Sequence, residues 1–511
     1  MVGISVNLGR CRLHSIVRTG GAGTAEPPQF ASASSARGST SFSSFDWLRV
    51  AYPLPAYLLS MCLLSMCLLS PSAHAQGSRP SGAGLRPPPG TTVPGDEAAE
   101  EDWQLRWQAT WVGQRKPSFG ARYSGENSLA ANTELSRSFT ATAMLGKRLW
   151  QGAKLYVNPE VAAGRPLSDL TGFAGFPNGE LARTSGSSPK LYLARLFVRQ
   201  SIGFGGGRQV VESDQNQLGG LVDARRLVIT AGMFPLIDVF DDNAYSHDAR
   251  TQFMNWSMVT HGSFDFAADA RGYSRGVALE WFDLGWAVRV GRFMMPRESN
   301  GLALNRALAR SHGDQIELER EYELAGRPGK LRLLAWRNRA VMGGFDDALA
   351  FAAAGGGAPA VENVRRDQSK SGWGINVEQS LGRLGGAFLR FGRNDDRTET
   401  YAYTEIGGSL SGGVLLAGRN WGREHDSAGI ALARNTLSAS HQRYLAAGGL
   451  GFFIGDGRLS YRPERTVELF YSAGVLPRVW LSINAQRVFA PAYNADRGPA
   501  TVVGLRLHTN F

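Results

Sequence analysis

The sequence predicts an all-β fold, a transmembrane, antiparallel, up-and-down β-barrel of about 16 strands that is preceded by a signal peptide. Three observations support this prediction. Apolar and polar residues alternate in short segments from Asp102 onward, an apolar stretch near the start is followed by a small-residue cleavage site, and no cysteine follows that site. The 511 residues are many for one domain, but barrels often reach this length as a single domain.

Residues 51–70 (AYPLPAYLLSMCLLSMCLLS) form the apolar stretch, which is too short and too proline-interrupted for a membrane-spanning helix. Ala73 and Ala75 follow as an A-x-A site, so we expect a secretory signal peptide that is cleaved after Ala75. A mitochondrial presequence is the alternative, although such peptides lack an apolar core of this kind. We assign residues 1–75 to an N-terminal extension and signal peptide, residues 76–101 to a flexible Pro/Gly/Ala-rich periplasmic lead-in, and residues 102–511 to the barrel.

The composition after residue 75 argues against several classes of protein. All three cysteines (Cys11, Cys62 and Cys67) precede the cleavage site, so disulfides and thiolate metal sites are excluded from the mature chain. Residues 1–75 hold five Arg and two acidic residues, which leaves a net charge of +8 in the remainder, where 44 of the 50 basic residues are Arg. The arginines are spread through strand-like segments without a dense basic run, so nucleic acid is not an expected partner.

The clearest alternation runs from Asp314 to Leu324. Glutamine and glutamates at every second position (Gln315, Glu317, Glu319, Glu321, Glu323) share one face of a strand, whereas a helix would scatter them around its circumference. So many carboxylates on one face need water or cations opposite them, because isolated buried charge is costly. The next segment, 329–336, carries Lys330 and Arg332 on one face, so an antiparallel hairpin would place bases opposite acids.

Further segments repeat this pattern. In residues 190–201, Tyr192, Ala194, Leu196 and Val198 alternate with Arg195, Phe197 and Arg199, and residues 285–293 and 478–485 alternate in the same way. Near the start, a stripe of Trp103, Trp107 and Trp111 suits the aromatic girdle of a membrane barrel. The chain ends on an alternating segment, 501–511, whose final Phe511 resembles the terminal aromatic residue that the barrel-assembly machinery reads in bacterial outer-membrane proteins.

Motifs that suggest chemistry have simpler explanations here. Gly272-Tyr273-Ser274-Arg275-Gly276 matches G-x-S-x-G, but that nucleophile elbow needs a helix after it, and a strand pattern follows instead, so we expect no catalytic residue. The histidines lack metal-binding spacing, and the glycine-rich stretches 203–207 and 326–330 lack a phosphate-binding fingerprint. We therefore expect no metal and no cofactor, and interpret both glycine-rich stretches as turns.

Residues 238–256 (DVFDDNAYSHDARTQFMNW) are too long and polar for a hairpin turn. They could form an external loop, a loop folded into the lumen, or a calcium loop, although the spacing does not fit the calcium pattern. In a lumen, opposed carboxylates and guanidiniums would offer acceptors and donors to a polyol, while aromatic faces would contact a sugar ring. The constriction residues expected on that interpretation are Asp238, Asp241, Asp242, Asp248 and Arg250.

The region 107–511 resembles the carbohydrate-selective porin family of outer membranes (OprB type). The resemblance rests on long ungapped phrases, which include LWQGAKLYVNPE (149–160), GFPNGE (175–180), residues 238–256, AADARGYSRGVALEW (267–281), RFMMPRESNGL (292–302) and GRPGKLRLLAWRNRA (326–340). It implies a sixteen-stranded barrel in the bacterial outer membrane, in contact with its lipid, through which small neutral sugars or polyols diffuse passively. Whether three barrels assemble as a homotrimer stays open.

The alternation also predicts which polar residues point inward. The expected pore-lining residues are Arg195, Arg199, Arg289, Glu317, Glu319, Arg332, Arg390, Glu468, Asn484 and Arg506. Three other functions are compatible with the same barrel. A channel for anionic solutes, such as phosphate or an acidic saccharide, is supported by the arginine excess and would show a strong anion preference. An outer-membrane enzyme would show hydrolysis that Ser274→Ala abolishes, and an adhesin is the remaining alternative.

Overall fold

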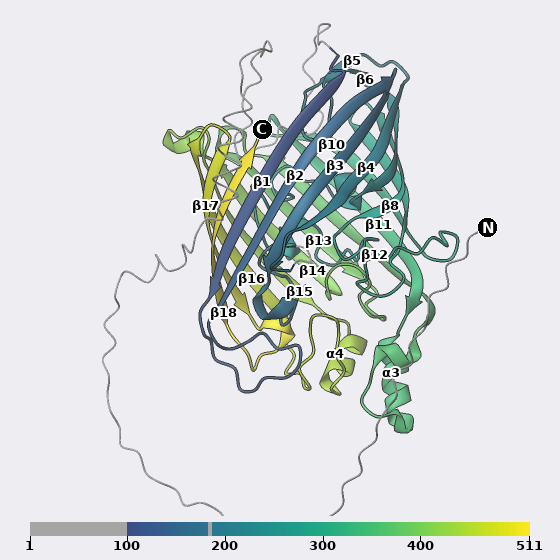
Figure 1. The fold of residues 1–511 in the computed structure, drawn as a ribbon, viewed down its shortest axis with the longest axis vertical. Helices are drawn as coiled ribbons and strands as arrows, with labels where there is room; N and C mark the ends of the chain where they lie inside the picture. The colour runs from purple at the N-terminus through teal and green to yellow at the C-terminus, as the bar shows by residue number, and fades with distance from the viewer. Residues whose placement is uncertain (1–99, 182–185) are drawn as a thin grey trace, which may run out of the picture. The chain divides into compact units, whose positions relative to one another are not determined.

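The computed structural model describes residues 100–181 and 186–511. The predicted extension and signal peptide (1–75) lie outside the described residues, as does the predicted lead-in apart from Glu100 and Glu101. Sixteen antiparallel strands form one closed barrel in which strands adjacent along the chain pair and β18 closes onto β1 (Figure 1). The predicted fold class is therefore confirmed.

The barrel strands are β1 (Trp103–Lys116), β2 (Glu134–Trp150), β3 (Ala153–Arg165), β4 (Lys190–Gly203), β7 (Arg226–Phe234), β8 (Ser274–Asp283), β9 (Trp286–Met294), β10 (His312–Leu324), β11 (Arg327–Met342), β12 (Arg366–Ser380), β13 (Gly385–Asn394), β14 (Gly408–Ala417), β15 (Ser427–Thr436), β16 (Glu464–Leu476), β17 (Val479–Phe489) and β18 (Ala500–Asn510). A separate two-stranded sheet contains β5 (Arg208–Val211) and β6 (Gly220–Asp223).

Short helices lie in the connections: η2 (Leu167–Leu170), η3 (Leu236–Asp238), α2 (Trp256–Val259), α3 (Phe345–Phe351), η4 (Ala352–Gly356), η5 (Val361–Val364), η6 (Gly382–Leu384), η7 (Gly418–Trp421), α4 (Ala439–Ala446) and η8 (Pro491–Tyr493). None of the helices in the described part of the chain combines the length and the apolar character that crossing a membrane requires.

The two ends of the barrel differ in their connections. At the short-turn end, Leu284 and Gly285 alone join β8 to β9, and both have positive φ (48° and 81°), as a two-residue type I′ turn requires. At the long-loop end, residues 235–273 join β7 to β8. Bacterial outer-membrane barrels place short turns on the periplasmic side and long loops outside, so this asymmetry indicates which end faces which compartment.

One connection at the short-turn end departs from this pattern. Residues 204–225, between β4 and β7, contain the β5–β6 sheet, and we call this segment the mouth hairpin. The glycine-rich stretch 203–207, which we predicted to be a turn, instead continues from β4 beside residues 224 and 225, and three of its glycines have positive φ (75° to 94°). The sheet itself was not predicted, because each of its strands has only four residues.

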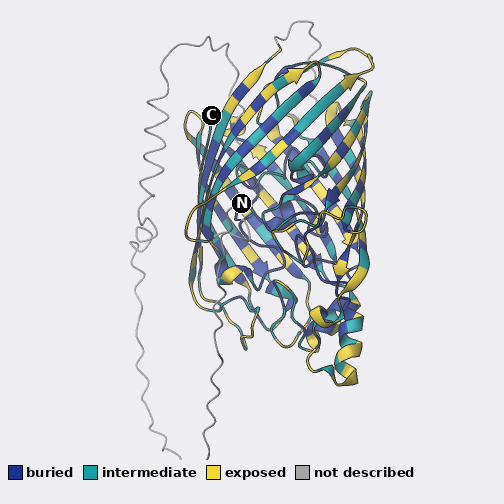
Figure 2. Ribbon diagram, turned by 45° about the vertical axis from the view of Figure 1, so that its right-hand side comes forward, coloured by how far each residue is buried: buried dark blue, intermediate teal, exposed yellow. Residues whose placement is uncertain are grey.

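The alternation predicted for β10 is confirmed, since Glu317 and Glu319 are buried while Ile316 and Leu318 are exposed. Buried and exposed residues also alternate along the other strands (Figure 2). Glu319 lies directly opposite Arg332 on β11, with 2.7 Å between Oε2 and Nε. The predicted hairpin with acids opposite bases is therefore present.

The hydrophobic core lies inside the barrel rather than outside it. Phe240, from the connection between β7 and β8, packs edge-on against Phe293 of β9, which in turn contacts Phe234 of β7. The loops of the long-loop end therefore fill much of the lumen, and the remaining space is bounded by polar side chains.

The outer surface is apolar along most of each strand and differs between the two ends. Five of the six exposed tryptophans among the described residues lie at the short-turn end: Trp103, Trp150, Trp281, Trp286 and Trp421. Exposed arginines occupy the last outward positions at the long-loop end: Arg115, Arg137, Arg165, Arg275, Arg292, Arg337, Arg339, Arg393, Arg434, Arg465 and Arg487. A large part of the positive charge of the chain therefore lies on the outer surface.

Candidate functional site

Residues 235–273, which we call the inward loop, fold into the lumen and cross it. Asp241 is fully buried, and its backbone N–H donates to Glu317 Oε2 on β10 at 2.7 Å. Farther along the loop, the N–H groups of Met254 and Asn255 donate to the Glu468 carboxylate on β16 at 2.6 and 3.0 Å. Of the three interpretations of residues 238–256, the structure shows the loop that folds into the lumen.

Carboxylates on the wall repeat this arrangement. Glu378 of β12 accepts the N–H of Ala244 in the inward loop at 2.9 Å. Glu464 of β16 accepts the N–H groups of Ala174 and Gly175, in the connection between β3 and β4, at 2.9 and 2.8 Å. Hydrogen bonds from N–H groups to ionised carboxylates are about twice as strong as neutral ones. The wall thus holds two loops by their backbones.

Two buried arginines complete these attachments. Arg390 of β13 donates to Asp241 Oδ1 at 3.0 Å and to the carbonyl oxygens of Ser246 and Met258 at 2.6 and 2.9 Å. Arg506 of β18 donates to the carbonyl oxygen of Gln252 at 2.8 Å. Both guanidiniums fix the fold of the inward loop rather than point into open space.

The charges around Asp241 reinforce its attachment. Although burial opposes ionisation, Arg390 and His261 hold the pKa of Asp241 below its usual range. His261 lies 3.4 Å from Asp241, and burial together with Arg390 lowers the pKa of His261 to about 4. At neutral pH the cluster therefore contains one carboxylate, one guanidinium and a neutral imidazole.

A second cluster lies where the inward loop faces β3 and β4, and we call it the polar gate. Arg250 of the loop donates from Nε to Glu180 Oε1 at 2.7 Å and lies 3.4 Å from Glu160 of β3. Arg195 of β4 forms a two-pronged pair with Asp238 of the loop at 2.7 and 2.8 Å. Arg250 stays charged, because the two glutamates raise its pKa despite burial.

Two tyrosines add aromatic surface to the polar gate. The hydroxyls of Tyr192 and Tyr273 donate to Glu160 Oε1 at 2.5 and 3.1 Å. The guanidinium of Arg271 lies 4.4 Å from the ring centroid of Tyr192, and that of Arg195 lies 5.8 Å from the ring of Tyr273. The gate therefore combines three guanidiniums, three carboxylates and two phenol rings.

A bulge places Tyr192 in the gate. Asn158 of β3 pairs with Arg195, but the next residue, Pro159, pairs with Leu193, so Ala194 is an extra residue in β4. Such a bulge shifts the alternation by one residue, which turns Tyr192 to the same side as Arg195. The alternation predicts Tyr192 on the opposite face from Arg195, and this prediction is wrong because it assumes an unbroken strand.

The mouth hairpin bounds the open space on the side of the short-turn end. Leu218 is buried, with its N–H donating to the Tyr156 hydroxyl at 3.0 Å and its carbonyl accepting from Lys154 Nζ at 2.9 Å. Arg106 donates to Ser213 Oγ at 2.8 Å. The hairpin is thus fixed to β1 and β3 and projects into the barrel.

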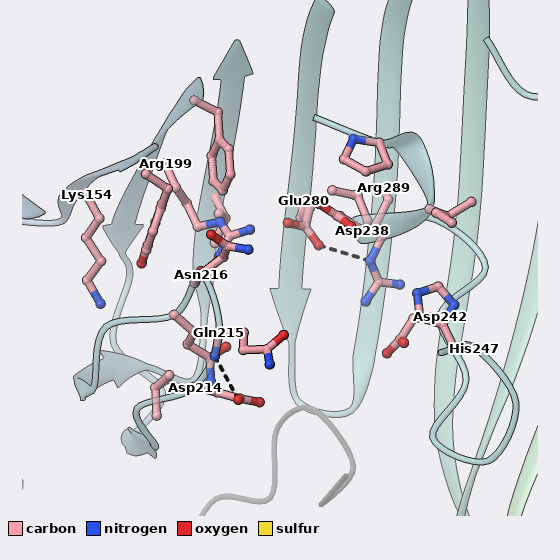
Figure 3. Close-up of a pocket in the computed structure, with 18 of the residues that line it drawn as sticks. Lys154, Arg199, Asp214, Gln215, Asn216, Asp238, Asp242, His247, Glu280 and Arg289 are labelled. Carbon is pink, nitrogen blue, oxygen red and sulfur yellow. Dashed lines mark hydrogen bonds and ion pairs between the residues drawn. The ribbon is translucent and has the colours of Figure 1, made fainter. Parts of the chain in front are cut away.

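A cavity of about 980 Å³ remains between these elements. Figure 3 shows Asp214, Gln215 and Asn216 of the mouth hairpin on one side, and Asp238, Asp242 and His247 of the inward loop on the other. The far wall is an ion-paired ladder in which Arg289 contacts Glu280, Glu317 and Glu319 at 3.0 to 3.1 Å. Opposite charges thus alternate along this path.

The structure divides the predicted site residues into two sets. Nine line the cavity: Arg195, Arg199, Asp238, Asp242, Asp248, Arg250, Arg289, Glu319 and Arg332. Six are buried where the inward loop meets the barrel wall: Asp241 of the loop itself, and the wall residues Glu317, Arg390, Glu468, Asn484 and Arg506, which contact the loop directly or through the Glu468 carboxylate. The first set borders the cavity, although Glu319 and Arg332 are themselves buried, and the second is in a position to shape the opening.

Sequence reasoning missed several residues around the opening. Glu160 and Glu180 each end one of the phrases quoted for the family resemblance, which was the available signal for them. Tyr273 was treated as part of a G-x-S-x-G match. Ser274, in the same match, is buried at the start of β8 and donates to the Met294 carbonyl at 2.7 Å, so it is part of the barrel wall. The described residues contain no group of His, Cys, Asp and Glu arranged to hold a metal ion.

Known proteins that resemble this chain include a family of porins and two outer-membrane channels. A sequence model described as carbohydrate-selective porin, OprB family, matches residues 126–511. A structure of OprB from Pseudomonas putida, titled as its high-pH form, aligns with a TM-score of 0.61 at 17% identity, covering 80% of this chain and 94% of that one. The outer membrane channel DcaP of Acinetobacter baumannii aligns with a TM-score of 0.45 at 10% identity, covering 81% and 99%. A search of curated proteins gave no match.

Proposed function

The chain belongs to the OprB family of carbohydrate-selective porins, and we propose that it passes small neutral carbohydrates or polyols by passive, facilitated diffusion through the polar gate. It is an outer-membrane porin and not an enzyme. The charge balance of the gate carries this proposal, because the guanidiniums of Arg195, Arg250 and Arg271 are matched by the carboxylates of Glu160, Glu180 and Asp238.

A balanced gate suits a solute that is polar but uncharged. Each sugar hydroxyl both donates and accepts a hydrogen bond, so a polyol can exchange its water for guanidinium donors and carboxylate acceptors. The phenol rings of Tyr192 and Tyr273 offer flat faces to the C–H groups of a sugar ring. An ion would be repelled at each pair by the side chain of its own charge. Rings of charged side chains select among ions in other channels by the same repulsion.

The anion-channel alternative rests on the net charge of the chain, and the position of the arginines weakens it. The arginines at the long-loop end, such as Arg115 and Arg434, are exposed on the outer surface of the barrel. Around the cavity, Arg195, Arg250 and Arg289 are each paired with carboxylates. The positive excess is thus concentrated away from the solute path.

Liposome swelling with the purified mature protein tests this proposal. We expect rapid swelling in glucose, slower swelling in disaccharides, and weak entry of gluconate, which matches glucose in size but carries a charge. The Arg250→Gln variant should slow glucose entry, because it removes a donor and leaves Glu180 without its guanidinium. The matched control is Arg393→Gln, which alters an exposed arginine on the outer face of β13. Preferential entry of gluconate would instead support the anion channel.

A further inference from the structure

The outer surface of the barrel carries a charged feature that the solute path does not use. Six outward arginines lie at the long-loop end of strands that are contiguous in the barrel through β18, and we call them the arginine belt: Arg434, Arg465, Arg487, Arg115, Arg137 and Arg165. Each is exposed and is one of the two outward residues of its strand that lie nearest the long-loop end. The belt therefore forms an arc on the outside of the barrel.

Alternation along the strands fixes the direction of these side chains. Arg137 of β2 stands between the buried residues Ser136 and Ser138, and Arg434 of β15 stands between the buried residues Ala433 and Asn435. Successive residues of a strand point to opposite faces, so both arginines point away from the lumen. Next to Arg434 on the outer face come Leu432 and Ile430, both exposed. The belt therefore lies just beyond the apolar band.

Two pairs within the belt bring like charges together. Arg137 lies directly opposite Arg165 on β3, and Arg434 lies directly opposite Arg465 on β16. Side chains directly opposite each other start about 4.5–5.5 Å apart at Cβ, and like charges in such positions are destabilising. Among residues 100–181 and 186–511, none of these four guanidiniums forms an ion pair with a carboxylate. Each pair thus leaves two adjacent cations without a fixed counter-charge.

The outer faces of the strands that carry the belt, and of β18 between them, contain no carboxylate among the described residues. The outward positions of β15, β16, β17, β18, β1, β2 and β3 carry no Asp or Glu. Elsewhere on the same rim the outcome is different, because Arg292 of β9 forms a two-pronged pair with Asp314 of β10 at 2.6 and 2.7 Å. An outward arginine therefore has a carboxylate partner between β9 and β10, whereas the outer faces of the seven adjacent strands named above offer none.

We propose that the arginine belt binds phosphate-bearing headgroups of anionic glycolipids in the outer leaflet of the membrane. The long loops mark the outer side of such barrels, so the belt lies at the level of the outer headgroups. A guanidinium accepts phosphate in a planar, two-pronged geometry. A phosphate placed between Arg137 and Arg165, or between Arg434 and Arg465, converts a repulsive pair into two attractive contacts.

Native mass spectrometry of the full mature protein in a non-ionic detergent tests the proposal, with bisphosphorylated lipid A as the probe. The wild type should retain this lipid, and it should retain the same lipid without its phosphates far more weakly. Two double variants, Arg137→Gln/Arg165→Gln and Arg434→Gln/Arg465→Gln, should each bind the phosphorylated lipid roughly tenfold more weakly, in line with the loss of charge-assisted hydrogen bonds. Inorganic phosphate at equal concentration should not displace the lipid.

The charge-matched control is Arg320→Gln/Arg327→Gln, which removes two exposed arginines from the short-turn end of β10 and β11 and should leave lipid binding unchanged. In lipid-free detergent the two belt variants should melt no lower than the wild type, because a repulsion has been removed. Equal lipid retention by wild-type and belt variants would overturn the proposal. Displacement by inorganic phosphate would show a free-phosphate site instead, and lower melting of the belt variants without lipid would show a structural role.

Discussion

Asp241 in the inward loop and Arg390 on β13 form a buried ion pair, with 3.0 Å between Oδ1 and Nε. Neither side chain is more than 1% exposed. Arg390 also donates to the carbonyl of Asp241 and to those of Ser246 and Met258, so one guanidinium holds three points of the loop. The width of the opening thus depends on a contact that no solute touches.

Breaking this contact should widen the pore. In an Arg390→Ala variant, Asp241 would be left buried without its main partner, and removing one member of a buried pair costs about 3–5 kcal/mol. We expect the inward loop to leave the lumen part of the time, so that trisaccharides enter liposomes faster than they do through the wild type. Arg393→Ala, on the outer face of the same strand, should keep the wild-type size limit. An unchanged limit in Arg390→Ala would show that the loop is held without this pair.

Removing one charge from the polar gate should change the ion that the pore prefers. Asp238→Asn leaves Arg195 without its two-pronged carboxylate and shifts the balance to positive. The reversal potential in a potassium chloride gradient should then move toward anion selectivity, whereas Arg195→Gln should move it toward cations. The Arg195→Gln/Asp238→Asn double variant should return near the wild-type value. Shifts of the same sign in both single variants would contradict this role.

The mouth hairpin should act as a second limit on solute size. The N–H of Arg225 donates to the Gly205 carbonyl at 2.9 Å, so residues 206–224 can be replaced by Asn-Gly, a two-residue turn that suits antiparallel strands. We expect a higher single-channel conductance and faster entry of disaccharides, because the hairpin side of the cavity would be open. A conductance equal to that of the wild type would place the size limit entirely at the polar gate.

Acidification should loosen the inward loop. The pKa of His261 is lowered to about 4, below its usual value near 6.5, so the unfolded chain binds a proton more readily than the folded chain. The contribution of His261 is therefore fully present above pH 6.5 and is lost as the pH falls toward 4. Open-channel current noise should rise over this window, and a His261→Gln variant should lack that part of the rise. Equal pH dependence in the two proteins would exclude His261 as its source.

The sequence supports some parts of this structure and not others, for physical reasons. The alternation of β10 predicts both its inward face and its pairing with β11. A row of buried glutamates needs basic residues opposite it, and the next segment of the chain carries them. The alternation of β16 and β18 likewise predicts that Glu468 and Arg506 point inward. It cannot tell that these side chains bind loop backbone rather than solute, since that depends on the path of a loop with no periodicity.

Local irregularities account for the other differences. The extra residue Ala194 reverses the side on which Tyr192 lies, and one inserted residue leaves no mark in an apolar pattern. The mouth hairpin has strands of four residues each, too short for alternation to be distinguished from chance. The opposed arginines of the outer belt depend on strand register, which single strands do not reveal. Sequence reasoning is therefore strongest for long strands and weakest where strands bend or end.

Current block by glucose is the most direct test of the central claim, that a charge-balanced gate selects neutral sugars. A single pore in potassium chloride should show brief interruptions of current whose frequency rises with glucose concentration. Gluconate at the same concentration should interrupt it less often, and the Arg195→Gln/Asp238→Asn variant should respond weakly to glucose while remaining open. Stronger block by gluconate than by glucose, or undiminished glucose block in the variant, would contradict this account of the gate.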